Sequence, residues 1–122
     1  GRGELVYLDV SNRLVTRASS NTVQANSTNT TPTVLGQLEV LAGVYDTGIC
    51  RAYRHGTGSS GGADYSALID PIDRGSSFRV GMLSFEIASQ YTGEVLSILL
   101  FPDKALSDEE LAALSNYLLS GD

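Results

Sequence analysis

The final segment of the chain, ALSDEELAALSNYLLSGD, has the pattern of an amphipathic helix with a cap at each end. Ser107 and Glu110 have the S-x-x-E spacing of a capping box, in which the two side chains bond the first free backbone N–H groups. Leucines recur every three or four residues and form one apolar stripe; they are Leu111, Leu114 and Leu118. Gly121 stands where a left-handed C-terminal cap belongs. The pattern predicts a helix between Ser107 and Gly121.

A helix of about twelve residues is marginally stable alone in water, so this helix must dock its leucines on another element. The rest of the chain reads as strands and turns. We therefore expect the helix to fold back onto a β-sheet, and the chain to belong to the all-β class.

Two hairpins are predicted in the first half of the chain. Residues 4–10 and 13–17 are β-rich runs separated by a short polar turn. Residues 38–45 and 49–55 form the stronger hairpin. Between them, Asp46-Thr47-Gly48 suits a type I turn closed by a glycine bulge.

The other segments give weaker or broader signals. Residues 19–33 are rich in Ser, Thr and Asn. They fit either an exposed loop or a polar edge strand, since Thr is a good strand residue. Residues 78–83 read as a strand. Residues 94–101, EVLSILLF, are apolar on both faces, which predicts a central strand buried on both sides.

Composition limits the partners. The 122 residues indicate one domain spanning residues 1–122, and no apolar run is long enough for a membrane span. The net charge is −6 and the eight basic residues are scattered, so we expect neither nucleic-acid binding nor membrane insertion. Cys50 is the single cysteine, and its apolar neighbours predict a buried, inert thiol.

Residues 93–121 resemble the end of concanavalin A-like lectin/glucanase domains of the laminin-G-like type. In that family a strand, a short link and a capped helix follow one another, and the matching residues here are Gly93, 94–101, 105–110 and Tyr117-Leu118. Upstream, residues 38–56 resemble the central hairpin of the family, and residues 78–82 resemble its next strand.

The resemblance implies an antiparallel β-sandwich of jelly-roll type with a short C-terminal helix. Full domains of this family are longer, so it implies either a shortened jelly roll or the C-terminal part of a longer protein. The paired cysteines of many extracellular laminin-G modules are absent here. Disulfide-free relatives are typical of phage tail or virion proteins and of bacterial surface proteins, which implies a virion or extracellular, cell-surface location.

No catalytic site is expected. The glucanases of this superfamily carry closely spaced carboxylates on one strand, in an E-x-D-x-E pattern that this sequence lacks. Asp108, Glu109 and Glu110 are contiguous, but their place at a helix start explains them. The G-x-S-x-G spacing of a serine hydrolase is also absent.

Two kinds of binding site remain open. Sugar recognition needs an aromatic surface and polar hydrogen-bonding groups, and five residues at strand ends or loops could supply them: Arg51, Tyr53, His55, Tyr65 and Tyr91. Packing on a sheet face and solvation are the alternative for these side chains. A loop carries Asp64, Asp70 and Asp73, which could ligate calcium, the one cofactor that the sequence suggests. Solvated turn aspartates are the alternative there.

The sequence thus predicts a non-catalytic carbohydrate-binding or adhesion module, a lectin-like part of a phage virion or tail or of a bacterial surface protein. Its partner would be a glycan. The alternative is a purely structural protein, used in virion assembly or decoration, whose partners are other subunits, including copies of itself in a homo-oligomer. A fragment of a polysaccharide-degrading enzyme is the third reading.

Overall fold

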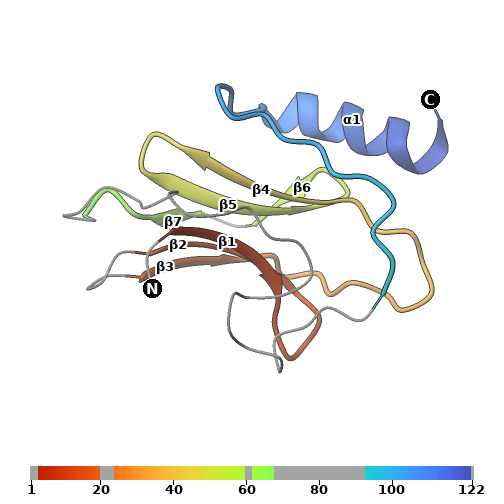
Figure 1. Cartoon of the computed structure of the whole chain (residues 1–122), viewed down its shortest axis with the longest axis horizontal. Helices are drawn as coiled ribbons and strands as arrows, with labels where there is room; N and C mark the ends of the chain where they lie inside the picture. The colour runs from red at the N-terminus through yellow and green to blue at the C-terminus, as the bar shows by residue number, and fades with distance from the viewer. Residues whose placement is uncertain (1–2, 20–23, 60–61, 68–92, 122) are drawn as a thin grey trace.

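The structure is a computed structural model, which describes residues 3–19, 24–59, 62–67 and 93–121. Two antiparallel sheets lie one above the other, and a helix lies over the second sheet (Figure 1). The first sheet has the strand order β1-β2-β3; the second has the order β4-β5-β6, with β7 also paired to β5. The elements are β1 Gly3–Leu8, β2 Leu14–Ser19, β3 Gln24–Thr28, β4 Leu41–Asp46, β5 Ile49–Arg54, β6 Thr57–Gly58, β7 Ala63–Asp64 and α1 Asp108–Ser120. The expected all-β class with a C-terminal helix is confirmed.

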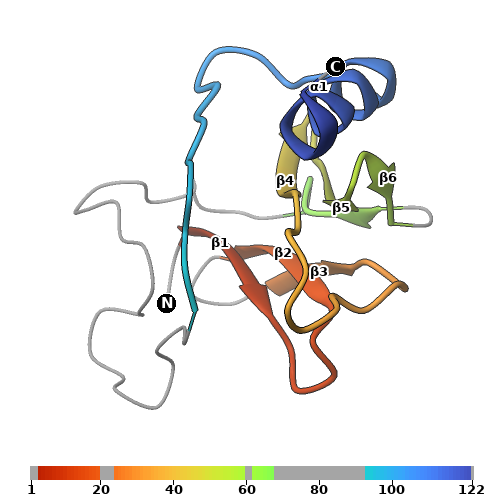
Figure 2. The same ribbon diagram turned by 90° about the vertical axis from the view of Figure 1, so that its right-hand side faces the viewer.

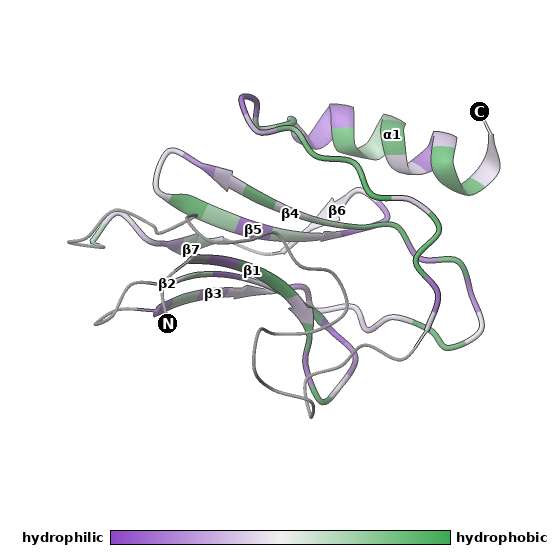
Figure 3. Ribbon diagram, in the orientation of Figure 1, coloured by the Kyte–Doolittle hydropathy of each residue, from purple (hydrophilic) through white to green (hydrophobic). Residues whose placement is uncertain are grey.

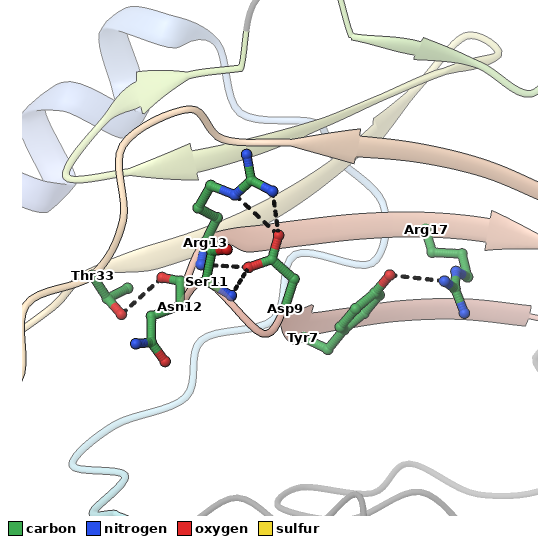
Figure 4. Close-up of polar contacts among 7 residues, drawn as sticks. All are labelled: Tyr7, Asp9, Ser11, Asn12, Arg13, Arg17 and Thr33. Carbon is green, nitrogen blue, oxygen red and sulfur yellow. Dashed lines mark hydrogen bonds and ion pairs between the residues drawn. The ribbon is translucent and has the colours of Figure 1, made fainter.

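The turn between β1 and β2 is held by the carboxylate of Asp9 (Figure 4). Its Oδ1 accepts hydrogen bonds from the backbone N–H groups of Ser11 (2.8 Å) and Arg13 (3.0 Å), and its Oδ2 accepts one from the Nε of Arg13 (3.0 Å). Asn12 has a φ of 59°, a left-handed conformation that Asn tolerates. The predicted hairpin is confirmed, although β1 ends at Leu8, before its expected end, because the turn begins at Asp9.

β3 decides between the two alternatives for residues 19–33. Residues 24–28 pair with β2 at one side of the first sheet, so the edge-strand alternative holds for them. Ala25 and Ser27 are buried, whereas Asn26 between them is exposed. Because strand side chains alternate between faces, a polar run can form a strand when every second residue is small enough for the interior.

The second hairpin is confirmed, but its turn is shorter than expected. In the pairing of β4 with β5, Asp46 lies opposite Ile49 and Leu41 lies opposite Arg54. Only Thr47 and Gly48 are therefore left in the turn. Their φ angles are 49° and 81°. Two successive positive φ angles are the mark of a type I′ turn, whose twist matches that of the flanking strands. The predicted three-residue turn with a glycine bulge is therefore wrong.

The two sheets meet through small and polar side chains. The buried residues facing between them are Leu14, Thr16, Ala18, Ala25, Ser27, Cys50 and Ala52, and all but Leu14 are small or polar. Gly43 belongs to the same layer, because a Cβ placed on it would lie 2.5 Å from Val6 Cγ2. Small residues on facing strands let the two sheets approach closely.

Hydrogen bonds also join the sheets. The side-chain amide of Asn29 donates to the carbonyl oxygens of Ala52 (3.0 Å) and Thr57 (2.8 Å). The hydroxyl of Tyr45 on β4 donates to the carbonyl oxygen of Arg17 on β2 (2.6 Å). Burial raises the pKa of Tyr45, so this hydroxyl keeps its proton and acts as a donor at any ordinary pH.

The helix forms as its caps predict. The Ser107 side chain accepts from the N–H of Glu110, and the Glu110 carboxylate accepts from the N–H of Ser107, so the capping box is present. Gly121 has the expected left-handed conformation, with a φ of 80°. Docking involves mainly the first half of the helix. Leu111 and Ser115 are buried, but Leu118 remains 36% exposed.

One strand prediction is wrong for the described residues. Residues 94–101 form no strand, and their large apolar side chains are exposed by between 46% and 73%. Figure 2 shows the segment rising past both sheets to the start of α1, and Figure 3 shows its hydrophobic character. A strand buried on both sides needs a hydrogen-bonding neighbour on each side, and none of the described residues provides one. The predicted strand at 78–83 lies outside the described residues.

Two glycines test how closely the helix packs on the sheet. A Cβ on Gly56 would lie 2.6 Å from Cα of Ala112 on α1, while a Cβ on Gly36 would meet nothing within 4 Å. Both have a similar positive φ, 79° and 81°. Gly36→Ala should therefore lower the free energy of unfolding by about 1 kcal/mol, because alanine is strained at a positive φ. Gly56→Ala should lower it by about 1–3 kcal/mol more, because the new methyl group also overpacks against α1. Urea unfolding of both variants measures the difference, and equal costs would contradict this docking.

Candidate functional site

A groove of about 320 Å³ lies between the outer face of the β4–β5 hairpin and the start of α1. Residues of the β4–β5 hairpin and residues 106–108 line it with both apolar and polar side chains. Its lining residues are Val44, Asp46, Thr47, Ile49, Arg51, Tyr53, Leu106, Ser107 and Asp108. This volume is at the lower end of the range for small-molecule sites.

Strand alternation places the hairpin residues on this face. Val44 pairs with Arg51, and Asp46 pairs with Ile49, in the register of the hairpin. The intervening residues, Cys50 among them, point toward the first sheet. The type I′ turn then brings Thr47 to the end of the groove, and the short link after residue 101 brings the helix cap over it.

Tyr53 anchors the helix to the sheet. Its ring is only 3% exposed, and its hydroxyl donates to Oδ1 of Asp108 at 2.5 Å. Burial, and then the hydrogen bond and charge of Asp108, raise the pKa of Tyr53 to about 12. The sequence nominated Tyr53 as an aromatic surface for a sugar, but its ring faces are covered. The alternative, packing on a sheet face, describes its position.

Arg51 is the basic group of the groove. It is half-buried, and its guanidinium forms no ion pair or hydrogen bond with the residues that the structure describes. Among the nominated residues that the structure describes, Arg51 and Tyr53 line the groove, and the Tyr53 hydroxyl is bonded to Asp108, so Arg51 is the one that offers donors there.

His55 lies in a different cluster. The carboxylate of Glu39 accepts from Arg54 Nη2 (2.9 Å) and from the backbone N–H of Val34 (2.6 Å), and its second oxygen forms an ion pair with His55 Nε2. Burial alone would raise the pKa of Glu39, but the bond from Arg54, the bond from Val34 and the charge of His55 outweigh it and lower the pKa below 4.5. This cluster ties the loop before β4 to the end of β5.

The remaining candidates are not brought together with the groove. Tyr65 contacts Tyr45 edge to face, with ring centroids 6.2 Å apart, and its N–H donates to the carbonyl of Gly48. The exposed Asp64 accepts from the N–H and the hydroxyl of Ser66, which lower its pKa.

Tyr91, Asp70 and Asp73 lie outside the described residues, so the candidate calcium site stays a prediction. Among the residues that the structure describes, no group of three His, Cys, Asp or Glu side chains is placed to hold a metal ion. In the same residues, no helix is long and apolar enough to cross a membrane.

Cys50 behaves as expected. Its side chain is fully buried and its Sγ donates weakly to the carbonyl of Thr16 at 3.6 Å. Burial raises the pKa of its thiol, so it stays protonated and unreactive.

Several groove residues were missed by the sequence reasoning. Asp46 and Ile49 share a face with Arg51, so strand alternation alone could have found them. Leu106 and Asp108 could not be found this way, because nothing in the sequence says where the helix cap lands on the sheet.

The Glu39 cluster predicts acid sensitivity. The pKa of Glu39 is lowered in the folded chain, so its contribution is complete above its ordinary value of 4.5 and is lost as the pH falls through the folded value. The wild-type chain should therefore lose stability in acid below about pH 4.5, and Glu39→Gln should lose less in that window. Urea unfolding over a pH series measures this, with the exposed Glu94→Gln as a control for net charge. Parallel pH profiles for the wild-type chain and Glu39→Gln would contradict it.

No family model matches the sequence, and a search of curated proteins gives no match. The fold is similar to that of an S-layer domain-containing protein from Clostridium thermocellum, solved as a crystal structure of residues 221–444. The TM-score is 0.55 and the sequence identity is 17%. The alignment covers 94% of this chain but 64% of that one, so the chain spans less than two thirds of that fragment. The likeness concerns the fold alone.

Proposed function

We propose that this chain is a non-catalytic module of a bacterial surface or virion assembly that binds a glycan in the groove between the β4–β5 hairpin and α1. The observation that carries the proposal is the placement of Arg51. Its guanidinium lines a groove of suitable size and has no partner among the described residues.

The groove has the mixed chemistry that a sugar requires. Val44, Ile49 and Leu106 offer an apolar surface for the C–H face of a sugar ring. Asp46 offers carboxylate oxygens that can accept from hydroxyl groups, and Arg51 offers donors in a planar fork. Because Tyr53 is buried, this mode of binding relies on hydrogen bonds and aliphatic contact rather than on aromatic stacking.

The surface location is a proposal supported by the structural neighbour, a protein whose description names an S-layer domain. The finer fold assignment, a concanavalin A-like jelly-roll sandwich, is likewise proposed. It is supported by two contacting antiparallel sheets and by the capped helix at the C-terminus.

The second candidate is a structural module that acts through contacts between subunits. The exposed apolar residues of the segment 94–101 favour it. Contiguous apolar surface of this kind usually marks an interaction site.

Replacement of Arg51 tests the glycan proposal. Arg51→Ala removes charge-assisted hydrogen bonds worth about 1.5–3 kcal/mol, so binding of the best ligand from a glycan array should weaken about tenfold or more. Isothermal titration calorimetry measures the affinity. Arg17→Ala is the matched control, since Arg17 lies on the first sheet, where its side chain bonds Tyr7 (Figure 4) and Asn26.

Two results would reject the proposal. One is that the array shows no bound glycan. The other is that Arg51→Ala binds as tightly as the wild-type chain does. Loss of binding in Arg17→Ala as well would show that the site lies elsewhere.

A further inference from the structure

Among the residues that the structure describes, β4 is an edge strand of the second sheet. The N–H of His55 donates to the carbonyl of Val40 at 2.8 Å, so this pair is hydrogen-bonded. In an antiparallel ladder the bonded pairs alternate with non-bonded ones. The backbone groups of Leu41, Gly43 and Tyr45 therefore point away from β5, and none of the described residues bonds them.

Within β4 itself, the residues and the bulge that often protect an edge strand are absent. Its sequence, LAGVYD, contains neither Lys nor Pro, and its pairing with β5 runs without a bulge. Natural proteins use those features to prevent another strand from pairing with a free edge. An unprotected edge with three open positions can accept a further strand.

The segment 94–101 has the composition of a strand, but no strand is paired with it among the described residues. It is apolar on both faces, has no Pro and only one charged residue, which is the composition of a strand. Among the described residues, the backbone bond from Lys104 to Phe101 at its far end is the only one it makes. In its own chain it runs past both sheets instead of along β4 (Figure 2).

We propose that 94–101 of one copy adds as a strand to the β4 edge of a second copy, and that the exchange is reciprocal. A two-fold arrangement closes the assembly, because each copy gives one strand and receives one. This inference goes beyond glycan binding and names the subunit contact behind the assembly candidate.

The size of the contact suits a weak, concentration-dependent dimer. β4 has six residues, so the paired length is about 20 Å, and with sheet layers about 10 Å apart each edge presents about 200 Å². Each copy contributes two such edges, one donated and one received. The total is therefore on the order of 800 Å², which lies in the range of weak or transient interfaces.

Paired proline variants test the exchange. Neighbouring strand amides point to opposite sides, so one of Ser97 and Ile98 donates to the β4 edge and the other points away. Ser97→Pro and Ile98→Pro should each weaken the dimer, and the one that removes the donating amide should weaken it by at least about tenfold more than Ser97→Ala, the control. Analytical ultracentrifugation over a concentration series measures the dissociation constant.

Amide hydrogen exchange locates the contact. The amides of Leu41, Gly43 and Tyr45 should become slow as the dimer forms, while that of His55 is slow at every concentration. A monomer at all concentrations overturns the proposal. So does a dimer without protection at these three amides, protection without a dimer, or open-ended polymers. Glycan binding by the same variants is measured separately, so failure of the exchange is distinguishable from failure of the groove.

Discussion

The close approach of the two sheets is the constraint on which the other features depend. A wide hydrophobic core would hold the sheets apart with leucines and phenylalanines. Here most of the facing positions carry Ala, Ser, Thr, Cys and Gly, with Leu14 as a larger side chain, and hydrogen bonds replace part of the apolar contact. The hydroxyls of Ser27 and Ser59 meet at 2.5 Å between the sheets, and Asn29 bonds two carbonyls on the far side. Buried polar groups stabilise only when they are paired, so these paired side chains favour one register between the sheets.

Such an interface leaves most of the large apolar side chains outside it. The stripe on α1 covers part of the outer face of the second sheet, through Leu111, and Tyr53 joins the two through Asp108. The later turns of the helix and the segment 94–101 remain exposed. An acidic chain with this distribution has its apolar surface where it can contact another molecule, which is why glycan and subunit contacts both remain candidates.

The elements predicted best were those specified by local chemistry. The capping box and the C-terminal glycine located α1 at both ends, and the β1–β2 and β4–β5 pairings appeared as alternation implies. The turn at Thr47-Gly48 was missed because Thr in a left-handed conformation is rare, and the sequence gives no signal for it. The strand predicted at residues 94–101 was wrong because an apolar pattern on both faces indicates that a strand would need burial on both sides. The pattern does not indicate whether a neighbouring strand is present.

The candidate site was predictable only in part for the same reason. Alternation places Arg51 and Tyr53 on one face, but whether each is open or covered depends on where a distant helix lands. Tyr53 became an anchor and Arg51 stayed available because Asp108, 55 positions along the chain from Tyr53, came to rest above the tyrosine. His55 left that face because the chain turns there with a φ of 50°.

β4 connects all of these features, because each side of this strand has a different role. Its inward side is kept small by Gly43, so that it fits against Val6 and Thr16 of the first sheet. Its outward side gives Val44 and Asp46 to the groove. Its edge is open in the part of the chain that the structure describes.

A strand added at that edge would extend the sheet beside Val44, so occupation of the edge and of the groove should influence each other. If the exchange occurs, the dimer and the monomer should differ in their affinity for a ligand in the groove. By linkage, a ligand that prefers one state must then shift the dissociation constant of the dimer, and with one groove in each copy a saturating ligand shifts it by the square of the affinity ratio.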